Sequence, residues 1–318
     1  MSIYLQPIIG QSSSNCFFFT LSTLLEYYKN GTCFHNACLW DFRFDYNDGK
    51  RLEDCLFEDE LYTQCYDFIF QVTGLVLVVS YTIDYKQVII KSLEKNKPVL
   101  VHYDSYYCPW SYNFQKYHYD HFFIIIGYDK GNYTCVDSFF LDETDKLSEE
   151  LFDKGIMHII EHEYHKNSTD ATSIINVVKD TMQANTKMLD QSKMFKDMLQ
   201  LSDCILDIDM DKEFEGHTDV KTIPLFTKIQ NIVLNRNALS DACEQLAKET
   251  GQDDYKEISE LFAQVNQEWN MLLVLLMKLF VTGMQKPRVN SSTKLKDIVK
   301  IEIEISEKFN KVCLGGYK

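Results

Sequence analysis

The chain has 318 residues, of which 45% are hydrophobic, and its 32 basic and 47 acidic side chains give a net charge of 32 − 47 = −15. This length supports one large domain or two ordinary ones, and 21 Phe and 19 Tyr exclude a disordered chain. The acidic balance argues against nucleic acid and anionic membrane as partners, because both are negative themselves, and it favours cationic substrates.

The first residues, the cysteines and the longest apolar block indicate the cellular compartment. The first residues, Met1 to Pro7, lack the basic region and the long apolar run of a secretory signal. Ten Cys are present without any Cys-x-x-Cys pair, and the longest apolar block, Met271 to Met284, is interrupted by Lys278 and too short to span a bilayer. We therefore expect a cytoplasmic protein with free thiols, and no sequence pattern indicates a cofactor.

The first predicted element is a helix that begins at Cys16. Asn15 or Ser14 is a suitable N-cap, and Leu21, Leu24 and Leu25 begin an apolar stripe at helical spacing. A helix N-terminus carries partial positive charge, which favours a thiolate. Gln11 lies five residues earlier, and its amide is a candidate donor, together with the Cys16 backbone N–H, to a developing oxyanion.

Strands and a second helix follow after a region rich in Phe, Asp and Cys. We expect a strand at 75–81, a helix at 84–95 and a strand at 98–103 that starts with a proline. The next loop is rich in aromatic residues, and its side chains are candidates for the wall of a substrate cleft: Asp104, Tyr106, Tyr107 and Trp110. Aromatic side chains that only anchor the loop are an equally good interpretation.

A hairpin over 121–138 carries the second half of a possible site. With Asp129-Lys-Gly131 as a three-residue loop, Tyr128 pairs with Asn132, and His121 and Asp137 lie on one face of the sheet. A two-residue loop would place Asp137 on the opposite face. A thiol at a helix start with a His and an Asp on a hairpin is the arrangement of a cysteine nucleophile, so the chain is predicted to attack carbonyl or thioester carbon. Each residue alone is more often structural.

A last strand is predicted at 157–164. It contains His158-Ile-Ile-Glu161-His162, which has the residue order of an inverted zincin motif. That motif requires a helix, and Ile159 and Ile160 favour a strand, so we predict no metal here and interpret the segment as a solvated edge strand. The elements up to residue 165 predict an α+β domain in which a helix packs on an antiparallel sheet.

Beyond a polar boundary at 166–174, the hydrophobic period becomes helical. Helices are predicted near 172–205, 220–250, 253–284 and 292–312, with loops at 207–222 and 286–290. Ser291, Ser292 or Thr293 would cap the last helix. We therefore predict two domains, 1–165 and a helical bundle at 166–318.

Several stretches also resemble a known family. These are Asn15-Cys-Phe-Phe-Phe-Thr-Leu-Ser-Thr-Leu-Leu25, Asn96-Lys-Pro-Val-Leu-Val-His-Tyr-Asp-Ser-Tyr-Tyr107, His121-Phe-Phe-Ile-Ile-Ile-Gly-Tyr-Asp129 and Val136-Asp137. In this order they resemble the papain-like, peptidase C39-like superfamily, and within it the butirosin biosynthesis protein H N-terminal family. The resemblance covers about residues 7 to 165. Phe17 follows Cys16 in place of the usual Gly, which points away from ordinary C39 peptidases.

The resemblance implies a papain-like cysteine-protease fold and acyl transfer. Cys16 would be the nucleophile, His121 the general base, Asp137 the orienting acid and Gln11 the oxyanion donor. The implied partners are an acyl or peptidyl carrier protein, which presents a phosphopantetheine thioester, and a small amine acceptor such as a diamine. Two alternatives remain open: a cysteine peptidase or amidase with the same residues, and a non-catalytic binding module on the same fold.

Overall fold

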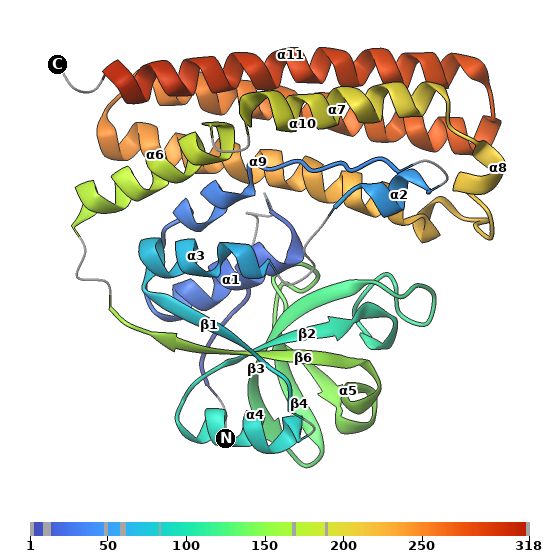
Figure 1. Ribbon diagram of the computed structural model, residues 1–318. Helices are drawn as coiled ribbons and strands as arrows, with labels where there is room; N and C mark the ends of the chain where they lie inside the picture. The colour runs from blue at the N-terminus through green and yellow to red at the C-terminus, as the bar shows by residue number, and fades with distance from the viewer. Residues whose placement is uncertain are drawn as a thin grey trace. The chain divides into compact units, whose positions relative to one another are not determined.

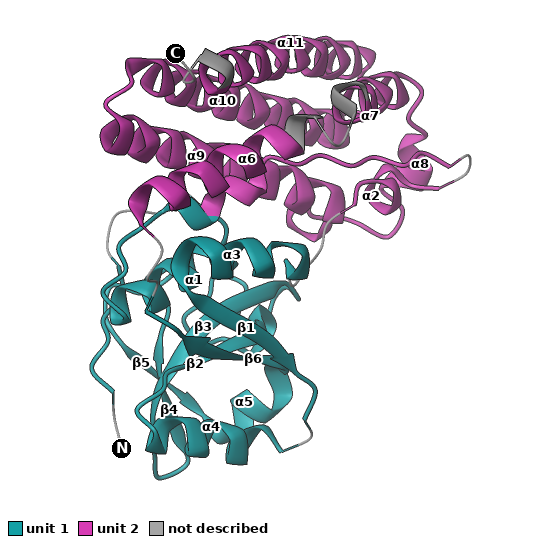
Figure 2. Ribbon diagram, turned by 60° about the vertical axis from the view of Figure 1, so that its left-hand side comes forward, with its two compact units in different colours: residues 1–35, 62–168 teal, residues 36–61, 169–318 magenta. Residues whose placement is uncertain are grey.

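The computed structural model describes residues 3–8, 14–47, 50–57, 62–82, 84–166, 170–187 and 190–315. The chain forms two compact units (Figure 2). Unit 1 consists of Met1–His35 and Tyr62–Ser168, and unit 2 of Asn36–Leu61 and Thr169–Lys318.

Unit 1 is built on one six-stranded antiparallel sheet with the strand order β1-β6-β2-β3-β4-β5 (Figure 1). Its strands are β1 (Leu75–Ser80), β2 (Val99–Asp104), β3 (Asp120–Asp129), β4 (Asn132–Val136), β5 (Asp145–Ser148) and β6 (Ile156–Tyr164). The α+β class predicted from the sequence is therefore confirmed. Strand β5 was not predicted, because it has only four residues and too little alternation of apolar and polar side chains.

Helices cover the sheet in unit 1. They are α1 (Cys16–Tyr27), α3 (Tyr66–Thr73), α4 (Tyr85–Glu94) and α5 (Glu149–Gly155), and two 3₁₀ turns accompany them, Thr63–Cys65 and Ser105–Tyr107. Helix α1 packs against β3: the rings of Phe17 and Phe122 lie 5.2 Å apart, and the Thr20 hydroxyl donates to the Phe122 carbonyl at 2.9 Å. The buried apolar stripe of α1 thus anchors the helix that begins at Cys16.

The prediction that residues 157–164 form an edge strand is wrong. Strand β6 pairs with β1 on one side and with β2 on the other, so it lies inside the sheet. Its alternation of exposed and buried residues reflects two faces of different exposure and not an open edge.

Unit 2 is helical. Its helices are α2 (Leu52–Cys55), α6 (Ala171–Lys187), α7 (Asp190–Leu206), α8 (Met210–Glu213), α9 (Pro224–Thr250), α10 (Asp253–Thr282) and α11 (Gln285–Gly315), with a 3₁₀ turn at Val220–Thr222. None of the helices in the described part of the chain is long and apolar enough to cross a membrane.

Two predictions on the last helix are wrong. Residues 286–290 are helical and not a loop, because α10 ends at Gly283 and α11 begins two residues later. Pro287 lies in the first turn, where a proline removes no intrahelical hydrogen bond. The predicted caps lie inside the helix instead, and Ser291 and Ser292 are buried there.

The segment 36–61 belongs to unit 2, although the predicted boundary at residue 165 placed it with the sheet. A 3₁₀ helix, Phe34–Leu39, leads into it. The Arg236 guanidinium donates to the carbonyls of Leu39 and Asp41, and the indole of Trp40 donates to Glu302 at 2.7 Å. These bonds bring distant parts of the chain together, so local sequence patterns could not reveal them.

Candidate active site

Cys16 is the first residue of α1, as the sequence predicted. The Asn15 side chain accepts a hydrogen bond from the Phe18 N–H at 3.2 Å and caps the helix. Asn15 and Phe17 are buried, whereas Cys16 is half-buried, so its thiol lies at the edge of the fold. The first N–H groups of any helix have no intrahelical acceptor, which leaves the Cys16 N–H available to a ligand.

A β-bulge decides where Asp137 lies. Residues Lys130 and Gly131 form a two-residue turn with φ of 48° and 78°, as type I′ turns require, and Asp129 pairs with Asn132. The predicted three-residue loop is therefore wrong. The register shifts between Ile125 and Gly127, where one extra residue enters β3.

This register shift places Asp137 on the face of the sheet that the sequence predicted. Beyond the bulge, Ile125 pairs with Cys135 and Ile124 with Val136. Continuing that register places Asp137 beside Phe123, which shares a face with His121 two residues away. The two-residue turn alone would have turned Asp137 to the other side of the sheet, and the bulge cancels its effect.

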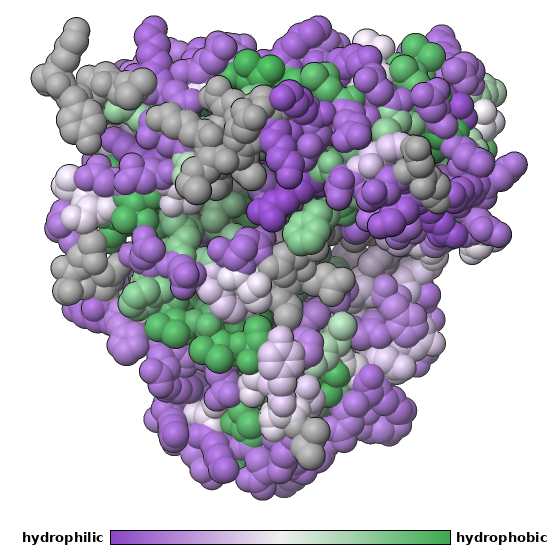
Figure 3. Space-filling model, viewed as in Figure 1, coloured by the Kyte–Doolittle hydropathy of each residue, from purple (hydrophilic) through white to green (hydrophobic). Residues whose placement is uncertain are grey.

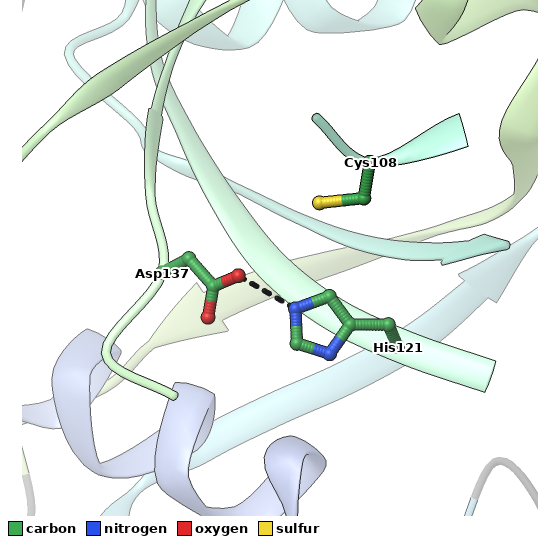
Figure 4. A group of neighbouring side chains, drawn as sticks. All are labelled: Cys108, His121 and Asp137. Atoms are coloured by element: carbon green, nitrogen blue, oxygen red, sulfur yellow. Dashed lines mark hydrogen bonds and ion pairs between the residues drawn. The ribbon is translucent and has the colours of Figure 1, made fainter. Parts of the chain in front are cut away.

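His121 and Asp137 form a buried hydrogen-bonded pair. The imidazole Nε2 lies 2.6 Å from Asp137 Oδ2, and neither residue is more than 2% exposed (Figure 4). A carboxylate can only accept, so Nε2 carries the proton. The other ring nitrogen, Nδ1, is then the atom of His121 that can meet a second partner.

Cys16 is the candidate second partner. Burial alone would lower the pKa of His121, but the charge and hydrogen bond of Asp137, together with the nearby Cys16 thiol, raise it to about 10. The Cys16 thiol also lies 4.0 Å from the Asp120 carbonyl oxygen. The described residues thus bring together the predicted nucleophile, base and orienting acid, which the sequence separates by 121 positions.

Trp110 contacts this cluster in a way that the sequence did not predict. Its indole Nε1 donates to Asp137 Oδ2 at 2.7 Å, and the Phe139 N–H donates to Oδ1 at 3.0 Å. Both carboxylate oxygens of Asp137 are thus held by donors besides His121. Trp110 was a candidate for the wall of a substrate cleft, and in the structure its indole N–H orients the acid.

Cys108 is a second thiol near the pair, and no sequence pattern indicated that it belongs to the site. Its sulfur, a nitrogen of His121 and an oxygen of Asp137 lie within 4.8 Å of one another (Figure 4). These are three potential metal ligands, and a metal requires a thiolate. Burial raises the pKa of the Cys108 thiol far above its usual value, and His121 and Asp137 already bond to each other. The group therefore suits a neutral packed thiol better than a metal site.

The other residues predicted to bind substrate form a separate cluster. The Asp104 carboxylate accepts from the Tyr106 N–H at 3.0 Å and lies 2.6 Å from His118 Nδ1. The Tyr106 ring stacks on His118 at 4.2 Å, and Tyr107 meets Tyr106 edge to face. The aromatic rings thus pack on one another and on His118, which fits the loop-anchoring interpretation. Gln11, the predicted oxyanion donor, lies outside the described residues.

The two histidines of the zincin-like motif do not share a ligand position. His158 and His162 are four residues apart on β6, which separates them by about 13 Å in an extended strand. Burial lowers the pKa of His162 to about 4, and its Nε2 lies 2.8 Å from the Tyr28 hydroxyl. His162 is therefore a neutral, hydrogen-bonded core residue.

A second His–Asp pair borders the site and was missed. His102 Nε2 lies 2.9 Å from Asp120 Oδ1, and the His102 ring stacks on Phe122 at 4.6 Å. Asp120 and His121 are consecutive on β3, so their side chains leave opposite faces of the sheet. Only the pairing of β2 with β3 reveals this pair, because His102 and Asp120 are 18 positions apart.

Comparisons with known proteins add no identification. No protein-family model matches the sequence, and no curated protein sequence matches it significantly. A functional assignment therefore depends on the geometry of the site and on the motif resemblance.

Proposed function

We propose that the protein is a cysteine-dependent N-acyltransferase. It would move an acyl group from a carrier-protein thioester, through an acyl-enzyme on Cys16, onto an amine to form an amide. One observation supports this most: the buried His121–Asp137 pair lies close to Cys16, a thiol at a helix N-terminus. The α+β architecture is compatible with a papain-like fold, which we propose as its class.

In the proposed starting state, His121 already carries the proton of Cys16 on Nδ1, because its raised pKa favours the imidazolium. The sulfur attacks the thioester carbonyl carbon, and the Cys16 N–H at the start of α1 donates to the oxygen on which negative charge develops. The bond to the carrier thiol then breaks, and the leaving thiolate takes its proton from His121. The acyl group is now bound to Cys16.

In the second step an amine attacks the acyl-enzyme. His121 accepts a proton from the amine, the C–S bond to Cys16 breaks, and the amide leaves while Cys16 recovers its proton. Asp137 holds the Nε2–H tautomer of His121 throughout and stabilises the imidazolium. The net charge of −15 favours a cationic acceptor, and the motifs resemble the amide-forming enzyme of closthioamide assembly, which uses a diamine.

Intact-protein mass spectrometry tests this proposal. Wild type mixed with an acyl thioester should gain the mass of one acyl group, and added diamine should discharge it as an amide. Cys16→Ala should gain nothing, whereas Cys108→Ala, which removes the neighbouring buried thiol, should still be acylated. Modification of Cys108 in place of Cys16 would contradict the assignment of the nucleophile.

The same experiment separates the alternatives. A peptidase or amidase would share the acyl-enzyme, but water would discharge it as fast as the amine does. Absence of any adduct across a panel of thioesters would favour a non-catalytic binding module.

A further inference from the structure

A pocket in unit 1 lies away from the candidate active site. It has a volume of about 460 Å³, which is in the range of small-molecule sites, and neither Cys16, His121 nor Asp137 lines it. The sheet residues on which it opens come from β1, β6 and the start of β2, and α4 forms one wall. The candidate site is at the other end of β2, where Asp104 pairs with Asp120.

The floor of the pocket is partly apolar. Val76 and Val78 of β1 lie cross-strand from Glu163 and Glu161 of β6, and 56% of Val78 is exposed. Val99 and Ile160 also line the pocket. Figure 3 shows apolar side chains gathered over the region of β1 and β6. An exposed apolar area inside a concave site is a common feature of ligand pockets.

The wall of the pocket is basic. Three Lys and two Glu line the pocket, a local charge of 3 − 2 = +1 in a chain of −15, and two of the Lys lie on or just after α4. Lys91 and Lys95 face the pocket and form no ion pair among the residues that the structure describes. Lys97 pairs with Glu163 at 4.0 Å, and Glu161 lies nearby on β6.

These charges divide the pocket into a basic side and an acidic side. The carboxylates of Glu161 and Glu163 repel an anion at the β6 side, whereas Lys91 and Lys95 attract one at the α4 side. We propose that this pocket binds an amphipathic anion, with its carboxylate or phosphate head at Lys91 and Lys95 and its apolar tail along Val76 and Val78.

Isothermal titration calorimetry with four eight-carbon probes tests the proposal on the full chain. Octanoate and octyl phosphate should bind with one-to-one saturation, and the stronger of the two identifies the head group. Octyl glucoside should bind more weakly, and octylamine should not bind. Equal binding of octylamine, or no saturation with either anion, would overturn the proposal.

Variants locate the binding. Lys91→Glu with Lys95→Glu should weaken anion binding by at least about tenfold, since both charge partners of the head group are reversed. Lys146→Glu is the control variant. It makes a single Lys-to-Glu change at an exposed position on β5, at the opposite edge of the sheet, and should leave binding unchanged. Val78→Asp should weaken binding through the tail.

Two further readouts exclude trivial explanations. Circular dichroism and thermal melting should show that the variants are folded, because these three Lys side chains and Val78 are exposed. The rate at which iodoacetamide alkylates Cys16 should not change in the Lys91→Glu, Lys95→Glu variant. Unchanged octanoate and octyl phosphate binding in this folded variant would show that the lysines do not recognise the anion.

Discussion

Each unit contains one fully buried carboxylate that accepts hydrogen bonds from tryptophan, and the two carboxylates serve different purposes. In unit 1, Asp137 accepts from His121 and from Trp110. In unit 2, Glu302 accepts from Arg236 at 2.7 Å and from two indoles, those of Trp40 at 2.7 Å and Trp269 at 3.2 Å.

The cationic partner makes the difference. Arg236 is completely buried and always protonated, and its remaining N–H groups donate to backbone carbonyls, so this pair can only hold structure. His121 titrates and keeps one nitrogen for the half-buried Cys16. A buried ion pair can thus take part in catalysis when its cation exchanges a proton at accessible pH and lies close to a nucleophilic side chain.

The largest effect should come from Asp137→Asn. An amide at this position can donate to Nε2, which places the imidazole proton on Nδ1, where it faces Cys16 and blocks proton transfer. The rate of Cys16 acylation should fall by about 10⁴-fold, as when the carboxylate of a Ser-His-Asp site becomes an amide. Stopped-flow or mass-spectrometric acylation rates measure this, and a rate within a few-fold of wild type would remove Asp137 from the mechanism.

Glu302→Gln tests the other carboxylate. It leaves Arg236 buried without a counter-charge, so the free energy of unfolding of unit 2 should fall by about 3 to 5 kcal/mol. Urea titration followed by circular dichroism measures the loss. Glu304→Gln, an exposed change on the same helix, is the matched control and should cost less than about 0.5 kcal/mol. An equal loss in both variants would mean that the buried pair stabilises nothing.

A pH series should separate the two pairs. The folded-state pKa of His121, about 10, is above its unfolded value of about 6.5, so its stabilisation is complete below pH 6.5 and declines as pH rises through 10. The cost of His121→Gln in unfolding free energy should therefore shrink, by about 4 kcal/mol, between pH 6 and pH 10. The cost of Glu302→Gln should stay constant over this range, because arginine does not titrate there. A His121→Gln cost that is flat with pH would contradict the raised pKa.

The smallest effects should come from the two tryptophans. Trp110→Phe and Trp40→Phe each remove one indole donor from a buried carboxylate, at a cost of about 1 to 3 kcal/mol for a charged acceptor. Trp110→Phe should also shift the pH profile of Cys16 alkylation, since Asp137 loses a donor beside His121. Trp40→Phe should change unfolding alone, and a changed alkylation profile in that variant would contradict the separation of roles.

Much of the fold could be predicted from the sequence because its signals are local. The Asn15 cap and the leucine stripe define α1, and the apolar runs after Gly74 and Pro98 define β1 and β2. The long helices of unit 2 follow from their periodicity. The sequence predictions were wrong where contacts with distant residues determine the structure. Strand β6 is an interior strand because it pairs with both β1 and β2, and residues 36–61 belong to the helical unit, where Arg236 binds their carbonyl groups.

The candidate site could be predicted only in part. The types and order of Cys16, His121 and Asp137 were informative, because few structural roles require a thiol at a helix start with a His and an Asp on one hairpin. The roles of Trp110 and Cys108 were not accessible, since each depends on a contact with residues 13 to 29 positions away. The face of Asp137 was predicted correctly from an incorrect turn.

By itself, the sequence determined most of the segments that become helices and strands and which residue types could perform thiol chemistry, because these depend on spacing and propensity along the chain. Only the tertiary structure decided whether those residues meet. The bulge in β3 sets the face of Asp137, burial and the Asp137 charge set the protonation of His121, and the packing of α1 on β3 brings Cys16 close to the start of β3. Each of these depends on contacts between distant residues, which no local pattern specifies.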